Sequence, residues 1–475
     1  MEELIGREQE ATQIKKYVKN NRNELIAIYG RRRVGKTFLI RKLFNDQFDF
    51  HATGIIDGTF EDELGVFNEA LEEYGYKGKK AKKWMDAFSS LGKLLKKKAE
   101  EKKGAPIIVF IDELPCFDTR NSRFIKMFGH FWNNTGAWIN NIKFFICGSA
   151  TSWMIRNIIN SRGGLHNRVT HEIHLRPFTL WQTEKYLKKN KFRWNQLGIL
   201  QIYMSLGGVP YYLSLLDNQK TIPENIDMLF FGEKALLRNE FDRLFNSLYH
   251  SPENYKEIIQ LLVSNKTGMT RRDMAKKLKV QDNGHFGDML ENLIYCDFLR
   301  KYNNGGRVNG AIYQITDFFT LFHHQFCKKN ITDPDYWVKM SGTPTVNTWY
   351  GLTYERVCQY HVREIIHALR FDTIHTEYYS WRSKKSSPEA QIDIIIERAD
   401  DNISICEVKY SKTIYSINKA EHEKINYREE AFRKETGTEK GIQTCIITTF
   451  GLKQNSHSDI ADQTITLKDL FTKIP

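Results

Sequence analysis

The chain has 475 residues, of which 41% are hydrophobic, and its 70 Lys and Arg against 57 Asp and Glu give a net charge of +13. This length accommodates about three domains, and the apolar content excludes wholesale disorder. No apolar run approaches the roughly 18 residues of a membrane helix, and the start lacks the basic and apolar segments of a signal peptide, so we expect a cytoplasmic protein without a membrane partner. The positive charge favours a polyanionic partner such as nucleic acid, although a lysine-rich solvated surface explains it equally well.

The most specific pattern runs from Gly30 to Thr37 and reads Gly-Arg-Arg-Arg-Val-Gly-Lys-Thr. It fits the phosphate-binding pattern Gly-x4-Gly-Lys-Ser/Thr, and it lies between a predicted buried strand at residues 25–29 and a predicted helix at residues 38–44. Lys36 would reach the β- and γ-phosphates, Thr37 would hold Mg²⁺, and the helix N-terminus would add its positive end. The predicted nucleotide-binding residues are Gly30, Arg33, Val34, Gly35, Lys36, Thr37 and Phe38.

A second buried strand is predicted at residues 106–111, where an apolar run ends in Asp112 and Glu113. Continuous apolar runs are typical of parallel strands that are covered on both faces. Asp112 would bind Mg²⁺ directly or through water, and Glu113 would polarise the attacking water. Downstream of a phosphate loop, this pair of acids predicts a hydrolytic site.

A third buried strand, predicted at residues 143–149, ends at Ser149, which is placed to sense the γ-phosphate or to orient the water. The polar loop at residues 161–170 follows, and an arginine from such a loop can neutralise charge on the transferring phosphoryl group. Arg168 is our choice and Arg162 the second, while an ordinary surface role stays open for both. If Arg168 acted across subunits, the chain would form a homo-oligomer.

These segments together resemble the archaeal-type ATPase family of the AAA and signal-transduction class, which is found in archaea and bacteria. The resemblance covers roughly residues 1–245 and also draws on residues 4–8, 175–178 and 207–213. It implies that the nucleotide is ATP. It also implies that the segment around Gly207 to Pro210 belongs to a helical lid over the nucleotide.

The middle of the chain has a different pattern, which predicts three helices and a hairpin. The helices are expected at residues 255–263, 271–278 and near 284–296, and the hairpin strands at residues 298–302 and 311–315 with a turn at residues 303–306. This order describes a winged helix, whose third helix often enters a DNA major groove. Here the third helix carries acids and no Lys or Arg, so we favour a packing or relay role, while the basic second helix could still contact a DNA backbone.

The last third predicts another α/β unit, with an amphipathic helix starting at residues 351–358 and two strands at residues 391–397 and 403–410 joined by a short turn. Glu407 and Lys409 are two apart, so both point to one sheet face. Pairing of the two strands would bring Asp393 beside them. Asp393 and Glu407 could then hold a divalent cation, and Lys409 could orient a water or stabilise the pentavalent phosphate.

This Asp…Glu-x-Lys arrangement resembles the restriction-endonuclease-like superfamily, in particular the C-terminal domain often fused to archaeal-type ATPases. The resemblance implies that Glu355 matches the helix glutamate of that fold, whereas Ile392 stands where the namesake motif has a proline. Two alternatives stay open: ordinary surface charges, or a nuclease-like fold that binds DNA without cutting it.

The predicted architecture is therefore α/β: a P-loop NTPase parallel sheet (residues 1–175), a helical lid (176–248), a winged-helix domain (249–330) and a C-terminal restriction-endonuclease-like domain (331–475). The predicted function is an ATP-binding and ATP-hydrolysing switch coupled to a metal-dependent, nuclease-like domain that interacts with DNA. The alternative is an ATP-dependent regulator whose nuclease-like domain binds a partner and does not cleave.

Overall fold

The computed structural model describes residues 4–249, 251–265, 267–302, 310–327, 331, 333–383 and 386–474. The chain divides into two units. The first unit consists of Met1–Pro177, Asn246–His250 and Glu291–Asp297, and the second of Phe178–Phe245, Ser251–Leu290 and Phe298–Pro475. Among the described residues, none of the helices combines the length and the apolar composition that crossing a membrane requires.

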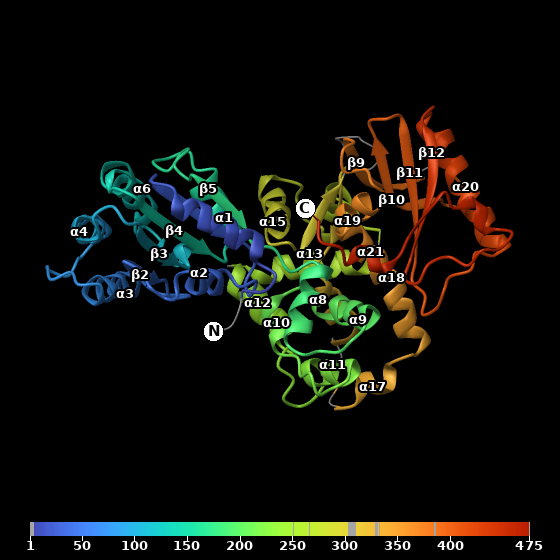
Figure 1. Ribbon diagram of the computed structural model, residues 1–475, viewed down its shortest axis with the longest axis horizontal. Coiled ribbons are helices and arrows are strands. Elements are labelled where there is room, and N and C mark those ends of the chain that lie inside the picture. Colours follow the sequence, from blue (N-terminus) through green and yellow to red (C-terminus); the bar gives the residue numbers. More distant parts are fainter. Residues whose placement is uncertain are drawn as a thin grey trace. The chain divides into compact units, whose positions relative to one another are not determined.

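The first unit is built on a five-stranded sheet in the order β2-β3-β4-β1-β5, and every neighbouring pair is parallel (Figure 1). The strands are β1 (Glu24–Tyr29), β2 (Phe50–Thr53), β3 (Ile107–Asp112), β4 (Ile142–Gly148) and β5 (His171–His174). The helices are α1 (Glu8–Lys19), α2 (Lys36–Phe44), α3 (Phe60–Glu73), α4 (Trp84–Lys102), α5 (Leu114–Phe117), α6 (Phe124–Asn134) and α7 (Thr151–Met154), with single turns η1 (Gly136–Trp138) and η2 (Ile155–Ile159).

Alternating side chains of this sheet enter two separate cores on its opposite faces. Leu25 and Ala27 of β1 pack with residues of α3, α4 and α6. Ile26 and Ile28 pack on the other face with residues of α1 and α2. Burial on both faces explains the continuous apolar runs, because neither face of such a strand meets water. The three strands predicted in this region are confirmed, with ends shifted by at most one residue.

The order of the strands decides which side chains meet. Strand β4 pairs with β1 on one side and with β3 on the other. The residue after β4 therefore lies between the loop after β1 and the acids after β3, all at the carboxyl edge of the sheet, where ligands of open α/β sheets bind.

The second unit begins with the helices α8 (Leu180–Lys189), α9 (Gln196–Leu206), α10 (Pro210–Ser214), α11 (Ile222–Phe230) and α12 (Glu240–Leu248). Gly208, before α10, lies against the backbone of Phe178, whose amide donates to the Gly208 carbonyl at 2.6 Å. A Cβ atom at Gly208 would stand 1.9 Å from the carbonyl oxygen of Phe178, so only glycine allows this approach.

Three helices and a small antiparallel sheet follow, as the pattern predicts. They are α13 (Pro252–Ser264), α14 (Arg271–Leu278), α15 (Gly284–Tyr295), β7 (Leu299–Tyr302) and β8 (Ile312–Ile315). A third strand not anticipated from the sequence, β6 (Met269–Thr270), pairs with β8. The turn predicted at residues 303–306 lies outside the described residues.

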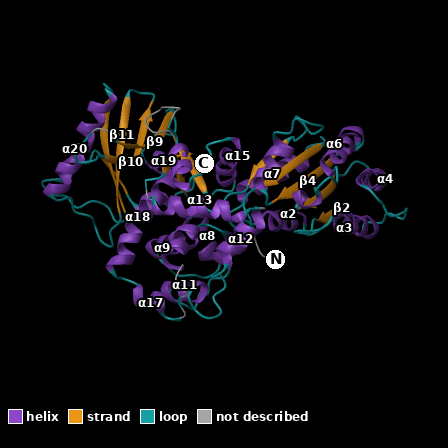
Figure 2. Cartoon of the chain, turned by 180° about the vertical axis from the view of Figure 1, so that it is seen from behind, coloured by secondary structure: helices purple, strands orange, loops and turns teal. Residues whose placement is uncertain are grey.

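The C-terminal part holds a mixed five-stranded sheet in the order β13-β12-β11-β10-β9, with helices packed against it (Figure 2). Its strands are β9 (Thr376–Arg382), β10 (Gln391–Arg398), β11 (Asn402–Lys409), β12 (Gly441–Thr448) and β13 (Gln463–Ile465). The helices are α16 (Phe318–Phe322), α17 (Tyr336–Met340), α18 (Pro344–Tyr360), α19 (Val362–Ala368), α20 (Lys419–Thr436) and α21 (Leu467–Leu470), with the turns η3 (His323–Cys327) and η4 (Ser458–Ile460).

The two strands predicted from the Asp…Glu-x-Lys segment pair antiparallel, as expected. The helix expected from residue 351 begins earlier, at Pro344, because Thr343 caps its N-terminus and proline is favoured in the first turn. The described residues thus form a parallel P-loop-like sheet with helices, a small antiparallel sheet and a C-terminal mixed sheet. The finer domain boundaries and the winged-helix and endonuclease-like assignments stay predictions.

Candidate functional site

The loop between β1 and α2 has the backbone that its sequence pattern implies. Arg33 and Gly35 both have positive φ angles, 73° and 90°, and α2 begins at Lys36 directly after them. Successive N–H groups in such a turn face a concavity that suits an anion. Gly30 is required for another reason: a Cβ atom there would lie 2.2 Å from the carbonyl oxygen of Leu175, which follows β5.

Lys36 and Thr37 occupy the positions expected of a phosphate-binding loop. The buried ammonium group of Lys36 donates to the carbonyl oxygens of Gly30 at 2.9 Å and Arg31 at 3.0 Å, so it lies folded over the loop. The hydroxyl of Thr37 donates to Asp112, the last residue of β3. Burial raises the pKa of Asp112, and this hydrogen bond opposes the rise. Phe38 follows in the first turn of α2 and is 48% exposed.

Glu113 and Ser149 lie together, although 36 residues separate them in sequence. The backbone amide of Ser149 donates to Oε2 of Glu113 at 3.0 Å, and its hydroxyl donates to Oε1. Glu113 has a left-handed backbone, with φ of 46°, directly after β3. The structure thus brings Lys36, Thr37, Asp112, Glu113 and Ser149 to one edge of one sheet.

Arg7 is a residue whose role the sequence did not reveal. Its buried guanidinium donates to the carbonyl oxygen of Val34 in the phosphate loop at 3.0 Å and to that of Arg176 at 2.6 Å. The N-terminal segment is therefore tied to the phosphate loop and to the segment after β5. In the sequence, only the part that residues 4–8 play in the family resemblance pointed to this region.

Arg162 and Arg168, in the loop at residues 161–170, are not held in place as the residues above are. The side chains of Arg162 and Arg168 are both exposed. Neither shows a side-chain hydrogen bond or ion pair within the part of the chain that the structure describes, and their role in phosphoryl transfer stays a prediction.

In the C-terminal sheet, Asp393 lies at an irregularity of β10. The register of β10 with β9 shifts between Ile392 and Ile395, which places Asp393 in a bulge. Its carbonyl oxygen leaves the ladder and accepts hydrogen bonds from Ser380 Oγ at 2.6 Å and from Gln359 Nε2 at 3.0 Å. Bulges beside active sites re-aim side chains. The carboxyl of Asp393 accepts a hydrogen bond from Gln391 Nε2 at 3.3 Å, and the charge of Glu407 acts on it.

Glu407 and Lys409 share a face of β11, as their spacing predicts. Lys409 Nζ lies 2.8 Å from Glu407 Oε1 and 2.8 Å from Glu421 Oε1 on α20. Burial opposes the charge of Lys409, but the two carboxylates outweigh it and raise its pKa. Arg428, also on α20, donates to the other oxygen of Glu407. Neither Glu421 nor Arg428 was anticipated, because no local pattern links α20 to β11.

Glu355, on α18, completes the group of acids. Burial and the charges of Asp393 and Glu407 raise the pKa of Glu355, and burial and Glu407 raise that of Asp393. Glu407 is buried, and Glu355 and Asp393 are half-buried. Carboxylates that repel one another in such a place suit a hard divalent cation, for which oxygen donors are preferred. Yet within the described ranges no three His, Cys, Asp or Glu side chains are grouped so as to hold a metal ion. The donor chemistry of these carboxylates fits a hard divalent cation such as Mg²⁺ or Mn²⁺.

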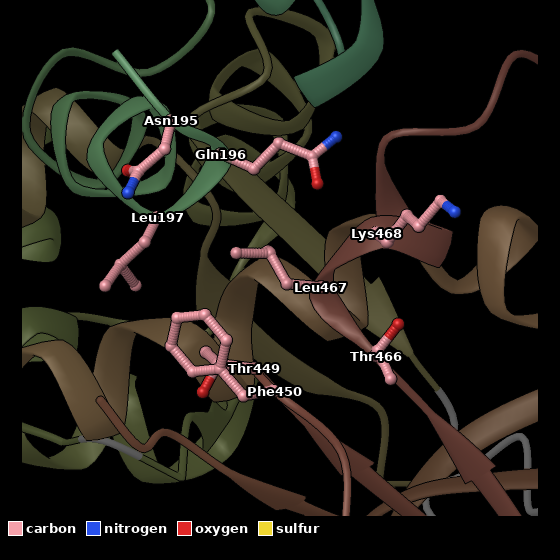
Figure 3. A pocket seen from close by; sticks show the side chains of 8 residues that line it. All are labelled: Asn195, Gln196, Leu197, Thr449, Phe450, Thr466, Leu467 and Lys468. Carbon is pink, nitrogen blue, oxygen red and sulfur yellow. The ribbon is translucent and has the colours of Figure 1, made fainter. Parts of the chain in front are cut away.

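A separate pocket of about 350 Å³ lies in the second unit, between the start of α9 and the segments before and within α21 (Figure 3). Asn195 caps α9 through the amide of Gly198, and Phe450 covers one side of the pocket. None of the predicted site residues lines it, and we assign it no ligand.

Comparison with known proteins finds two families that match separate parts of the chain. Residues 4–216 match a family described as an ATPase domain predominantly from Archaea, and residues 318–425 match one described as archaeal and bacterial proteins of unknown function. An uncharacterised protein of Methanocaldococcus jannaschii is 24% identical over 345 residues, which cover 69% of this chain and 70% of that protein.

Two solved structures illustrate the likeness. The Walker-type ATPase paby2304 of Pyrococcus abyssi has 18% identity and a TM-score of 0.47, covering 67% of this chain and 95% of its own. The ORC2 protein of Aeropyrum pernix has 12% identity and a TM-score of 0.41, covering 72% of this chain and 93% of its own. With the phosphate-loop geometry and the two family matches, residues 4–216 form an archaeal-type P-loop ATPase domain, which implies ATP binding, and residues 318–425 belong to a C-terminal domain of the archaeal and bacterial family whose function is unknown.

Proposed function

We propose that the first unit hydrolyses ATP with Mg²⁺. In this proposal the backbone amides after Gly30 bind the phosphates, and Lys36 swings from the loop carbonyls to the β- and γ-phosphates. Thr37 and Asp112, already joined by a hydrogen bond, hold Mg²⁺. Bound there, the ion would neutralise phosphate charge as phosphoryl transfer requires. Glu113 orients the attacking water, and Ser149 fixes Glu113.

We further propose that the C-terminal sheet carries a metal-dependent site for cleaving DNA, with the ATPase as its switch. The observation that carries this proposal is the bulge at Asp393, whose carbonyl is held by Ser380 and Gln359 while the charge of Glu407 acts on its carboxyl. A half-buried acid whose pKa is raised by a second acid is costly for stability alone, and such arrangements collect at functional sites. A carboxylate that served only as a surface charge could stand on a regular strand, without a bulge.

Each residue of this site has a distinct role in the proposal. Asp393, Glu407 and Glu355 would hold the divalent cation, which supplies Lewis acidity at the scissile phosphate and lowers the pKa of a bound water. Lys409 holds its proton on a nitrogen fixed by Glu407 and Glu421, so it would stabilise charge on the phosphate. The net charge of +13 favours the approach of DNA.

A cleavage assay tests both parts. The full chain is incubated with linear and supercoiled DNA, Mg²⁺ or Mn²⁺, and ATP or none. We expect ATP-dependent cleavage that Asp393→Ala abolishes. Asp401→Ala, in the exposed turn between β10 and β11, is the matched control and should cleave as wild type does. Equal cleavage by wild type and Asp393→Ala refutes the nuclease site.

The ATPase part is tested separately by nucleotide binding and turnover. Lys36→Ala should abolish ATP binding, whereas Glu113→Gln should bind ATP and hydrolyse it about 10²- to 10⁴-fold more slowly. Normal ATP binding by Lys36→Ala would refute the assignment of the phosphate loop.

A second candidate function is ATP-dependent binding of DNA or protein without cleavage. It is favoured by one observation: both oxygens of Glu407 are held by cations of the chain itself, Lys409 and Arg428. Under this alternative, partner binding responds to ATP and survives Asp393→Ala, and no cleavage occurs in any condition.

A further inference from the structure

Arg428 is a cation that the protein itself supplies to the acids of the C-terminal sheet. Its guanidinium forms an ion pair with Oε2 of Glu407, while Lys409 holds Oε1 at 2.8 Å. Glu407 is only 5% exposed, so little of its carboxylate is left for solvent. Both oxygens that the proposed metal site needs are therefore engaged by side chains.

The helix that carries Arg428 is fixed to the sheet. Helix α20 begins at the side-chain cap Asn418, and its buried residues Ile425 and Phe432 face the sheet. Phe432 packs in one core with Ile403 and Ile405, which lie on the same face of β11 as Glu407. Glu421, Ile425, Arg428 and Phe432 recur at intervals of four, three and four residues, which places them on one side of the helix. Figure 1 shows α20 alongside β12 and the rest of this sheet.

The charge of Arg428 interacts with all three acids. Burial opposes its charge, but Glu407, Asp393 and Glu355 all act on it and raise its pKa. The positive charges of Arg428 and Lys409 together thus compensate the carboxylates that would otherwise ligate a divalent ion.

We infer that Arg428 is a resident counterion that competes with the divalent cation for Glu407, so that the cation binds only when Arg428 leaves this carboxylate. The inference rests on the proposed metal site and adds the residue that controls its loading. The exchange is one of charges: a guanidinium leaves an oxygen of Glu407 and a divalent ion takes that oxygen. A guanidinium and a metal ion cannot share it, because like charges a few ångströms apart repel strongly in a partly buried site.

Removing the charge of Arg428 should therefore tighten metal binding. We expect Arg428→Gln to bind Mn²⁺ about tenfold or more tightly than wild type, because the competing cation is gone. Arg428→Lys keeps the charge and should stay near wild type. The matched control is Arg433→Gln on the same helix, whose arginine pairs with Glu429 and lies outside the group of acids.

Binding of Mn²⁺ to the full chain is measured without nucleotide. Titration calorimetry and the electron paramagnetic resonance signal of free Mn²⁺ are the two readouts. The Asp393→Ala variant defines the binding that belongs to this site. Circular dichroism confirms that each variant is folded. If Arg428→Gln fails to fold, Arg428→Met serves as the second charge-removing variant with the same expectation, because its methylene groups retain part of the packing of the arginine stem.

The outcomes separate this inference from the proposed function. Tighter binding in Arg428→Gln, lost again in the double variant with Asp393→Ala and absent in Arg433→Gln, supports it. If Mn²⁺ binding depends on Asp393 but is unchanged or weaker in Arg428→Gln, the role of Arg428 is wrong, whereas the proposed metal site is supported. Identical binding by wild type and Asp393→Ala overturns the metal site, and this inference with it.

Discussion

Ser149 holds the carboxylate of Glu113 at both of its oxygens, one through its backbone amide at 3.0 Å and the other through its hydroxyl. The contact follows from the strand order, because β4 is inserted between β1 and β3. Ser149 therefore positions the residue that we propose to orient the attacking water. Because β4 pairs with both β1 and β3, Ser149 at its end lies between the phosphate loop and Glu113.

We predict that Ser149→Ala lowers kcat of ATP hydrolysis about 10- to 100-fold with little change in KM. A misoriented Glu113 would slow the attack of water, whereas the contacts that bind ATP would be unchanged. Ser149→Thr keeps the hydroxyl and should recover part of the rate. Steady-state phosphate release measures both, with Ser152→Ala in α7 as control. A rate for Ser149→Ala equal to or above that of wild type would show that the contact does not support catalysis.

Arg7 gives a second prediction. Arg7→Ala removes the donor to the carbonyl oxygens of Val34 and Arg176 and leaves the buried carbonyl of Val34 without it, which costs about 1–3 kcal/mol of unfolding free energy. Because Val34 belongs to the phosphate loop, ATP should also bind more weakly. Arg7→Lys should not restore either property, since one ammonium cannot reproduce the fork of a guanidinium.

Urea unfolding and nucleotide titration measure these two effects, with the exposed Arg22→Ala as control. If Arg7→Ala lost stability but bound ATP as tightly as wild type, the role of Arg7 would be structural only.

The sequence predicted the elements of both sites well, and for a physical reason. Strands β1, β3 and β4 are buried on both faces, so their apolar runs are long and unambiguous. The alternation of β11 likewise placed Glu407 and Lys409 on one face. What it could not predict was the order of the strands, and hence the contact of Ser149 with Glu113, because order depends on crossover connections rather than on local pattern.

Other features escaped prediction because they depend on tertiary contacts. The bulge at Asp393 is stabilised by Ser380 and Gln359, which come from β9 and α18. Arg428 reaches Glu407 only after α20 packs on the sheet. Strand β6 has two residues and carries no periodic signal of its own. Residues distant in sequence supply each of these features, so a reading of short windows misses them.

The bulge itself can be tested without touching a proposed ligand. Ser380→Ala removes the shorter of the two hydrogen bonds to the Asp393 carbonyl, which should weaken Mn²⁺ binding by about five- to tenfold, the equivalent of one hydrogen bond. Mn²⁺ titration measures this, and Ser411→Ala, beyond the end of β11, serves as control. Unchanged affinity in Ser380→Ala would mean that Gln359 alone holds the carbonyl.

The titration of Glu63 should make the stability of the first unit depend on pH. Its side chain is fully buried at the start of α3, where Oε1 accepts from the amide of Ile55 at 2.9 Å and Oε2 has no hydrogen-bond partner among the described residues. Burial raises the pKa of Glu63 to about 7 from 4.5. Between these values the folded state keeps a proton that the unfolded chain has lost, so the unfolding free energy falls as pH rises from about 4.5 to about 7 and is then level.

Glu63→Gln carries no charge to bury and can still accept from Ile55. It should therefore be more stable than wild type by about 1–3 kcal/mol at pH 8, with a smaller difference at pH 5, because most of the ionisation cost arises between those values. Urea unfolding at both pH values measures the difference, with the exposed Glu69→Gln on the same helix as control. If the stability difference between Glu63→Gln and wild type did not grow from pH 5 to pH 8, Glu63 would be ionised at no cost and its burial would be compensated.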